Sequence, residues 1–172
     1  MTTILAEGVI RSFGDDINTD YIVPSRRKKE TIEPEILREY MFEDIEPGFF
    51  SSLQPNTILC AGKNFGCGSA MEVAVTVPVS AGIRAIVAKS FARTYQRNAI
   101  NNGLLALKAD ASALAVNVPA TIYEDRGEIL IASQSGVSVR CEPIPPFVID
   151  MIRHGGLLDY LSTHGCFPDG ER

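Results

Sequence analysis

The middle of the chain alternates short apolar runs with segments of helical character, and this order constrains the fold more than any other feature. The apolar runs at 57–61, 84–88 and 104–107 are bounded by turn residues, as buried strands are. Helices are expected between them, at 69–80 and 91–102. Strands that alternate with helices pair in parallel, because each helix crosses back over the sheet. The sequence therefore predicts an α/β fold with parallel strands at its centre.

Further strands are expected on both sides of this centre. Two precede it, at 4–11 and 21–23. Alternating apolar residues between turn-rich sequences indicate three antiparallel strands after it, at 121–123, 128–131 and 137–140. The prediction is therefore a mixed sheet rather than a purely parallel one.

Helices are expected to flank this sheet. One begins near Pro34 and runs to about Met41, and two short C-terminal helices are broken at Gly155-Gly156. Residues from about 165 to 172 are expected to form a flexible tail. The chain should thus form one domain over residues 1–172, a mixed sheet with flanking helices.

The composition narrows the class of function. Hydrophobic residues make up 45% and charged residues 22% of the 172 residues, which suits a globular domain with a substantial core. The formal charge of −5 disfavours a nucleic-acid partner, because binding phosphates requires a basic surface. No apolar run approaches the ~20 residues of a membrane helix, and residues 1–7 do not resemble a signal peptide. We expect a cytoplasmic protein without nucleic-acid or membrane partners.

The cysteines and histidines form no recognisable metal motif. None of the 4 cysteines belongs to a C-x-x-C pair, and both histidines lie near the C-terminus. We therefore expect no metal ligands in this chain and reduced thiols at Cys60, Cys67, Cys141 and Cys166.

The stretch from Gly62 to Gly68 is the strongest candidate for chemistry. Glycines in a turn between a strand and a helix let backbone N–H groups approach a ligand, and the helix N-terminus favours an anion such as a carboxylate. The turn would also expose the hydroxyl of Ser69. A purely structural interpretation is open as well, because Ser69 and Glu72 have the spacing of a capping box. The glycine spacing matches neither of the common nucleotide-binding motifs.

Several segments, in order along the chain, resemble the small subunits of 3-isopropylmalate dehydratase and homoaconitase. These subunits correspond to the swivelling domain of aconitase, so the resemblance implies a single swivelling β/β/α domain of the aconitase C-terminal type. The matching segments are 14–20, 61–69, 81–85, 89–93, 97–104 and 155–161.

The resemblance implies a hydro-lyase that dehydrates and rehydrates a 2-hydroxy acid. The main expectation is 3-isopropylmalate dehydratase, an enzyme of leucine biosynthesis. A separately encoded large subunit would carry a [4Fe–4S] cluster, and this chain would close the active site. Homoaconitase, a substituted-malate dehydratase and a non-catalytic acid-binding relative are the alternatives, whereas the acidic net charge disfavours an RNA-binding regulator.

The resemblance also assigns roles to individual residues. Ser69 matches the serine that removes the carbon-bound proton, and Asp20 matches an aspartate that positions the reacting groups. Arg26 and Arg27 are the candidates for binding a substrate carboxylate, which a guanidinium can hold with two parallel hydrogen bonds. The basic residues after them are expected to be solvated. The turn residues expected to line the substrate site are Gly66, Gly68, Ala70 and Met71.

Two departures from the family pattern leave the substrate open. After the first serine the family has Ser-Arg-Glu-His, where this chain has Ala70-Met71-Glu72-Val73, and Met71 cannot bind a carboxylate as an arginine does. The loop at 26–29 is Arg-Arg-Lys-Lys, although apolar residues would be expected against an isopropyl group. The first change makes the site more apolar, and the second makes it more basic.

Overall fold

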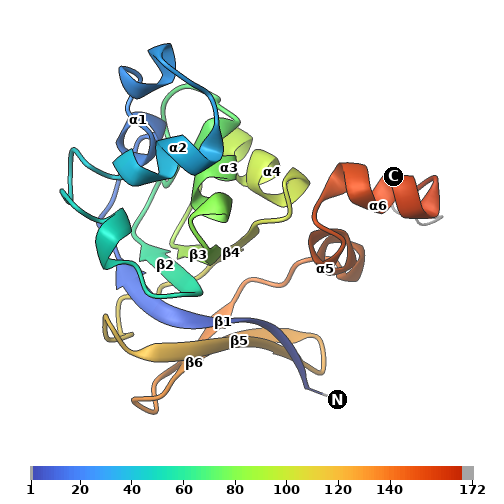
Figure 1. Ribbon diagram of the computed structural model, residues 1–172. Coiled ribbons are helices and arrows are strands. Elements are labelled where there is room, and N and C mark those ends of the chain that lie inside the picture. The colour runs from blue at the N-terminus through green and yellow to red at the C-terminus, as the bar shows by residue number, and fades with distance from the viewer. Residues whose placement is uncertain (1, 168–172) are drawn as a thin grey trace.

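The computed structural model describes residues 2–167, and one seven-stranded sheet organises them (Figure 1). The strands are β1 (Thr3–Ser12), β2 (Thr57–Ala61), β3 (Ile83–Ala88), β4 (Leu105–Lys108), β5 (Pro119–Asp125), β6 (Glu128–Ser133) and β7 (Ser138–Cys141). Their order across the sheet is β4-β3-β2-β1-β5-β6-β7. The predicted mixed sheet with flanking helices is confirmed.

The half of the sheet from β1 to β4 is parallel, as the alternation of strands and helices predicts. The crossover helices are α3 (Val73–Ser80) and α4 (Arg93–Asn101). All five residues of β2 are buried because both faces of the sheet are covered there. Leu59 and Ala61 point into one apolar cluster and Ile58 and Cys60 into the other, as alternate side chains of a strand must.

Strand β1 joins the parallel half to the antiparallel half. Its segment from Val9 to Ser12 pairs in parallel with β2, and its segment from Thr3 to Val9 pairs antiparallel with β5. Strands β6 and β7 continue the antiparallel half. The parallel half separates two apolar clusters, of which one is covered by helices and the other by the antiparallel strands and α5 (Pro146–Arg153).

The segment expected as a strand at 21–23 is instead part of the short helix α1 (Thr19–Ile22), so that prediction is wrong. Tyr21-Ile22-Val23 has strand-like composition, but the Asn18 side chain precedes it and accepts a hydrogen bond from the backbone N–H of Asp20 at 2.9 Å. This is the geometry of a helix N-cap. The cap formed by Asn18 has thus outweighed the strand propensity of residues 21–23.

Helix α3 begins at Val73, four residues later than expected, and its N-cap is Glu72 without a side-chain cap bond. Ser69 is therefore not a cap, and the capping-box interpretation is wrong. Pro78 lies inside α3 and has no N–H to offer the carbonyl of Ala74 one turn earlier. The hydroxyl of Tyr95 on α4 donates to that carbonyl at 3.1 Å, which ties the two crossover helices together.

The remaining helices agree with the expected ones. Pro34 begins α2 (Pro34–Leu37), which continues as a 3-10 turn to Tyr40. Helix α6 (Leu157–His164) follows α5 after Gly155-Gly156, both with positive φ. Much of the expected tail at 165–172 lies outside the described residues. Within residues 2–167, every helix is too short or too polar to span a bilayer.

Candidate functional site

The Gly-rich turn is held on one side by the acidic segment at 14–20. The N–H of Gly66 donates to the carbonyl of Ile17 at 2.7 Å, and the N–H of Thr19 donates to the carbonyl of Cys67 at 2.8 Å. Asp15 binds the start of the turn, because its carboxylate accepts from the N–H of Lys63 at 2.7 Å. Two segments that the sequence singled out separately thus form one backbone-bonded unit.

The segment at 89–93 holds the other side of the turn. The N–H of Phe65 donates to the carbonyl of Ser90 at 3.0 Å, and the N–H of Ala92 donates to the carbonyl of Phe65 at 2.9 Å. The ring of Phe65 is buried and meets the rings of Phe91 and Tyr95 edge-on. The turn is therefore fixed between two neighbours through its backbone and one buried aromatic side chain.

Two glycines are required by this close packing. Gly66 has φ +78°, and a Cβ there would lie 2.1 Å from the ring of Tyr95. Gly68 has φ +96°, and its Cβ would lie 2.4 Å from the side chain of Asn18. Any other residue would combine a strained backbone with a steric clash at either position. Both glycines therefore fix the shape of the turn.

Ser69 is exposed at the end of the turn. Its carbonyl accepts a hydrogen bond from the Thr19 hydroxyl at 2.9 Å. Among residues 2–167 its own hydroxyl has no hydrogen-bond partner, so it is available to a bound molecule. A hollow of about 50 Å³ adjoins it, lined by Thr19, Gly66, Gly68, Ser69, Ala70, Met71, Ala92, Thr94, Tyr95 and Asn98. The structure thus brings Ser69 together with all four turn residues expected to line the site.

Asp20 lies at the start of α1, beside the segment that binds the turn. Its carboxylate accepts a hydrogen bond from the Ser25 hydroxyl and lies 3.3 Å from the ammonium of Lys28. The hydrogen bond from Ser25, followed by the bond and charge of Lys28, lowers the pKa of Asp20 below its ordinary value. Asp20 is therefore an anion at neutral pH, able to accept hydrogen bonds and not to donate them.

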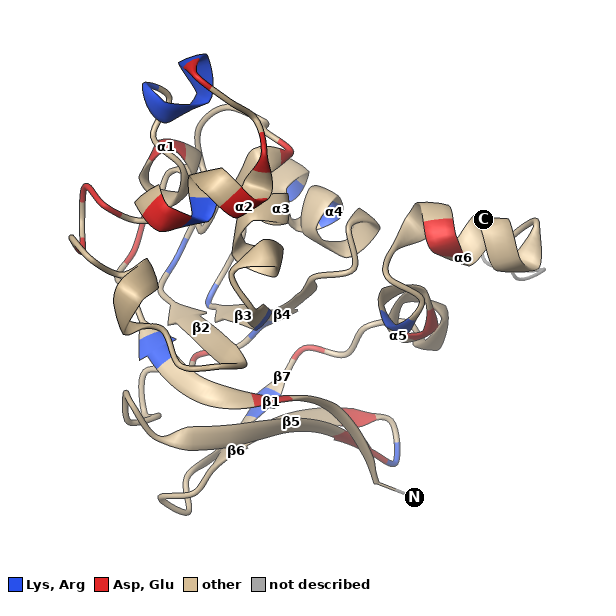
Figure 2. Ribbon diagram, viewed as in Figure 1, with Lys and Arg blue, Asp and Glu red and all other residues tan. Residues whose placement is uncertain are grey.

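The structure does not bring Arg26 and Arg27 to the turn. Arg26 donates to Glu43 and to Asp44, each at 2.6 Å. Arg27 donates to Glu43 at 2.9 Å and stacks on the ring of Tyr40 at 3.9 Å. The basic run projects beyond α1 at the top of the molecule in Figure 2. Both guanidinium groups thus have acidic partners within this chain, which the sequence did not predict.

Lys28 is the residue of this run that reaches the site, and its interpretation as a solvated loop residue is wrong. Its side chain is 15% exposed, and its ammonium contacts both the Asp20 carboxylate and the sulfur of Met71. Arg27–Lys29 forms a 3-10 turn, in which successive side chains point about 120° apart because three residues complete one turn. One of three consecutive basic residues must therefore face inward, and only the structure shows which one.

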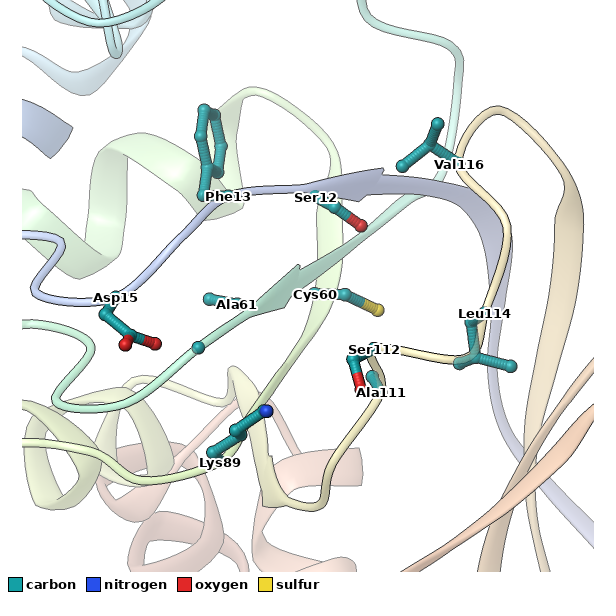
Figure 3. A pocket seen from close by; sticks show the side chains of 11 residues that line it. Ser12, Phe13, Asp15, Cys60, Ala61, Lys89, Ala111, Ser112, Leu114 and Val116 are labelled. Atoms are coloured by element: carbon teal, nitrogen blue, oxygen red, sulfur yellow. The ribbon is translucent and has the colours of Figure 1, made fainter.

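A second hollow, of about 310 Å³, lies where β1 and β2 end and shares no lining residue with the one at Ser69. In Figure 3, Lys89 and Asp15 lie on one side of it and Cys60 and Ser112 on the other. The Lys89 ammonium pairs with Asp110 at 3.2 Å. Burial raises the pKa of the Cys60 thiol to about 12, so it is not a nucleophile at neutral pH. The turn that carries Ser69 is therefore a better candidate for the functional site than this hollow.

Residues 2–167 offer no set of ligands for a metal. In the described part of the chain, no three His, Cys, Asp or Glu side chains lie together as a metal ion would require. Cys67 is the cysteine nearest the site, and burial, with a smaller contribution from Asp16, raises the pKa of its thiol. A protonated thiol is a poor ligand for a metal cluster. An iron–sulfur cluster therefore does not fit the residues that the structure describes.

Comparisons with known proteins agree with this fold. Residues 29–112 match the family described as the aconitase C-terminal domain. The chain is 38% identical to "3-isopropylmalate dehydratase small subunit 2" of Archaeoglobus fulgidus, over 89% of this chain and 92% of that protein. It is 39% identical to the "3-isopropylmalate dehydratase small subunit" of Sulfurisphaera tokodaii, over 92% and 94% of the two chains. The chain belongs to the family of 3-isopropylmalate dehydratase small subunits.

A solved member of this small-subunit family shows the same fold. The crystal structure of 3-isopropylmalate dehydratase from Methanocaldococcus jannaschii superposes with a TM-score of 0.81 at 32% identity, covering 96% of each chain. The family resemblance and the aconitase C-terminal fold class predicted from the sequence are therefore confirmed.

Proposed function

We propose that this chain is the small subunit of a 3-isopropylmalate dehydratase of leucine biosynthesis, active only with its large subunit. The observation that carries the proposal is the free, exposed hydroxyl of Ser69 at the end of a turn whose shape Gly66 and Gly68 fix. The names of the relatives support 3-isopropylmalate as the substrate, since several are 3-isopropylmalate dehydratase small subunits.

Ser69 would remove the carbon-bound proton of the 2-hydroxy acid. Dehydration breaks one C–H and one C–O bond on neighbouring carbons, so a base must face the C–H bond. A serine hydroxyl is a weak base and needs a site that stabilises its deprotonated form. Asp20, ionised at neutral pH, would accept a hydrogen bond from the substrate or from Ser69 and would position the reacting groups.

The partner would supply the rest of the site. Ser69, Ala70 and Asp20 are all exposed, so a substrate bound to this chain alone would lie largely in water. The large subunit would carry the [4Fe–4S] cluster, which supplies a Lewis acid for the departing hydroxyl. The words "small subunit" in the relatives' names support a two-chain enzyme.

Exposed apolar side chains mark the surface that would meet this partner. Tyr21, Ile32 and Ile36 are 42%, 69% and 51% exposed, and all three belong to the segment that includes α1, the basic run and α2.

We place the complex in the cytoplasm. The four cysteines of this chain are free thiols, as expected in a reducing compartment.

Reconstitution with the large subunit tests the proposal. The two chains are combined anaerobically, the cluster is loaded, and alkene absorbance is followed with 2-isopropylmalate, homocitrate and 2,3-dimethylmalate. We expect turnover of 2-isopropylmalate by the complex and by neither chain alone. Turnover of homocitrate or dimethylmalate instead would assign a different acid, and binding of an acid without any turnover would make this chain a non-catalytic relative.

A further inference from the structure

The proposed substrate is a diacid, and its two negative charges require cations. The basic run supplies four candidates on consecutive residues. Arg26 and Arg27 are held by the side chains of Glu43 and Asp44, which are not candidate site residues. Lys29 is exposed on the outer side of the 3-10 turn. Lys28 is therefore the cation of this run that the fold directs toward the Ser69 turn.

The surroundings of Lys28 suit an anion-binding ammonium. Its side chain is 15% exposed, so its charge is screened by water less than that of a surface lysine. Asp20 lies 3.3 Å from the ammonium and orients it. An ammonium has three N–H donors, and the contacts with Asp20 and Met71 leave one for a ligand.

Met71 is the third part of this arrangement. Its sulfur contacts the Lys28 ammonium, and its side chain borders the hollow beside Ser69. A cationic side chain at position 71 would place two positive charges in contact, and like charges at that separation repel strongly. A neutral, flexible thioether fills the space without this cost and lets the lysine reach the turn.

We infer that Lys28 binds a carboxylate of the substrate and that Lys28 and Met71 form a matched pair, in which one cation serves both positions. This inference rests on the proposed function, because it names the residue that holds the acid beside Ser69. It assigns to this site a ligand with a carboxylate next to the reacting carbons. It also gives the methionine at 71 a role: position 71 is neutral because the cation comes from position 28.

The test compares three variants in the reconstituted complex: Lys28→Met, Lys29→Met as the matched control, and the double variant Lys28→Met with Met71→Arg. The KM for the acid that wild type turns over is measured, together with the inhibition constant of 2-isopropylsuccinate, which lacks the hydroxyl. We expect Lys28→Met to raise both constants roughly 30-fold or more, with a smaller change in kcat. Lys29→Met should change them less than about twofold, because an exposed charge contributes little. The double variant should regain about tenfold of the lost affinity, because the arginine restores one cation.

Three results would overturn the inference: unchanged constants in Lys28→Met, equal losses in Lys28→Met and Lys29→Met, or no recovery in the double variant. Thermal unfolding and complex assembly are measured for each variant, and Lys28→Gln replaces Lys28→Met if the latter does not assemble. Unchanged constants in Lys28→Gln would be equally decisive. A wild-type complex that turns over no acid would defeat the proposed function, while the affinity for 2-isopropylsuccinate would still test Lys28.

Discussion

The Gly-rich turn and Lys28 of the basic run face the same site, but different interactions hold the turn and the run in place. The turn at 62–71 is bonded through its backbone to the segments at 14–20 and 89–93. The basic run at 26–29 is held by side-chain ion pairs near the surface. Backbone bonds persist when side chains change, whereas an ion pair depends on the identity of both partners. The fold therefore fixes the position of Ser69 and leaves the carboxylate-binding residues open to exchange.

This difference explains where the chain departs from its family pattern. The glycines and the serine of the turn are retained, and the replacements lie at 70, 71 and 73 and in the basic run. At Met71 and in the run, side chains determine the contacts. Substrate choice can change in such a segment without altering the geometry of the proton transfer. Changes within the turn should therefore affect folding, and changes in the run should affect binding.

The largest effect on stability is expected from Gly66→Ala. The new methyl group would collide with the Tyr95 ring at a backbone φ of +78°. We expect the free energy of unfolding to fall by roughly 2–4 kcal/mol, as for other changes that combine strain with overpacking. Urea denaturation followed by circular dichroism measures the change.

Gly82→Ala is the control for this change. Gly82 has φ +86°, but no atom lies within 4 Å of its added Cβ, so only the backbone cost of about 1 kcal/mol applies. Equal losses in Gly66→Ala and Gly82→Ala would show that close packing of the turn against Tyr95 does not contribute.

A smaller effect on stability is expected from Tyr95→Phe. This change removes the hydroxyl that donates to the Ala74 carbonyl, which Pro78 leaves without its helical partner. A buried carbonyl without a hydrogen bond costs about 1–3 kcal/mol. Thermal unfolding should show the loss, and the combination of Tyr95→Phe with Pro78→Ala should recover part of it, because an alanine at that position would supply the missing N–H. A double variant no more stable than Tyr95→Phe would contradict this explanation.

The smallest effect on stability is expected from Glu43→Gln, which removes the carboxylate that pairs with Arg26 and Arg27. The hydrogen bond and charge of Arg27, with the charge of Arg26, lower the pKa of Glu43 in the folded chain. A carboxylate with a lowered folded pKa stabilises the fold above its unfolded pKa, and this contribution is lost as pH falls through the folded pKa. The variant should be slightly less stable than wild type at pH 7, and the difference should vanish in acid. A difference that grows toward low pH would contradict this sign.

The sequence predicted the sheet and the turn well because both depend on local patterns. The apolar run at 57–61 coincides with β2, and the glycines of the turn at 66 and 68 do have positive φ. Short, fully apolar runs between turn residues leave few alternatives to a buried strand. The family resemblance assigned Ser69 and Asp20 to one site, which no local pattern could do.

Two of the errors share one cause, which is that a side-chain partner far along the chain decides the outcome. Arg26 and Arg27 are bound by Glu43 and Asp44, and no spacing rule links these positions. The Thr19 hydroxyl binds the Ser69 carbonyl, and residues 69–72 lie outside the helix. The other errors have local causes: the Asn18 cap precedes α1, and the phase of a 3-10 turn directs Lys28 inward.

Proton removal by Ser69 is the central claim, and release of a carbon-bound label tests it most directly. Wild type, Ser69→Ala and Ser51→Ala are assembled with the same cluster-loaded large subunit; Ser51 is also exposed but lies outside the turn. The acid substrate carries deuterium at the carbon that loses hydrogen, and its release to water is measured. We predict a loss of roughly 100-fold or more in Ser69→Ala and less than about twofold in Ser51→Ala. Release at the wild-type rate from a fully assembled Ser69→Ala complex would contradict the assignment of Ser69 as the base.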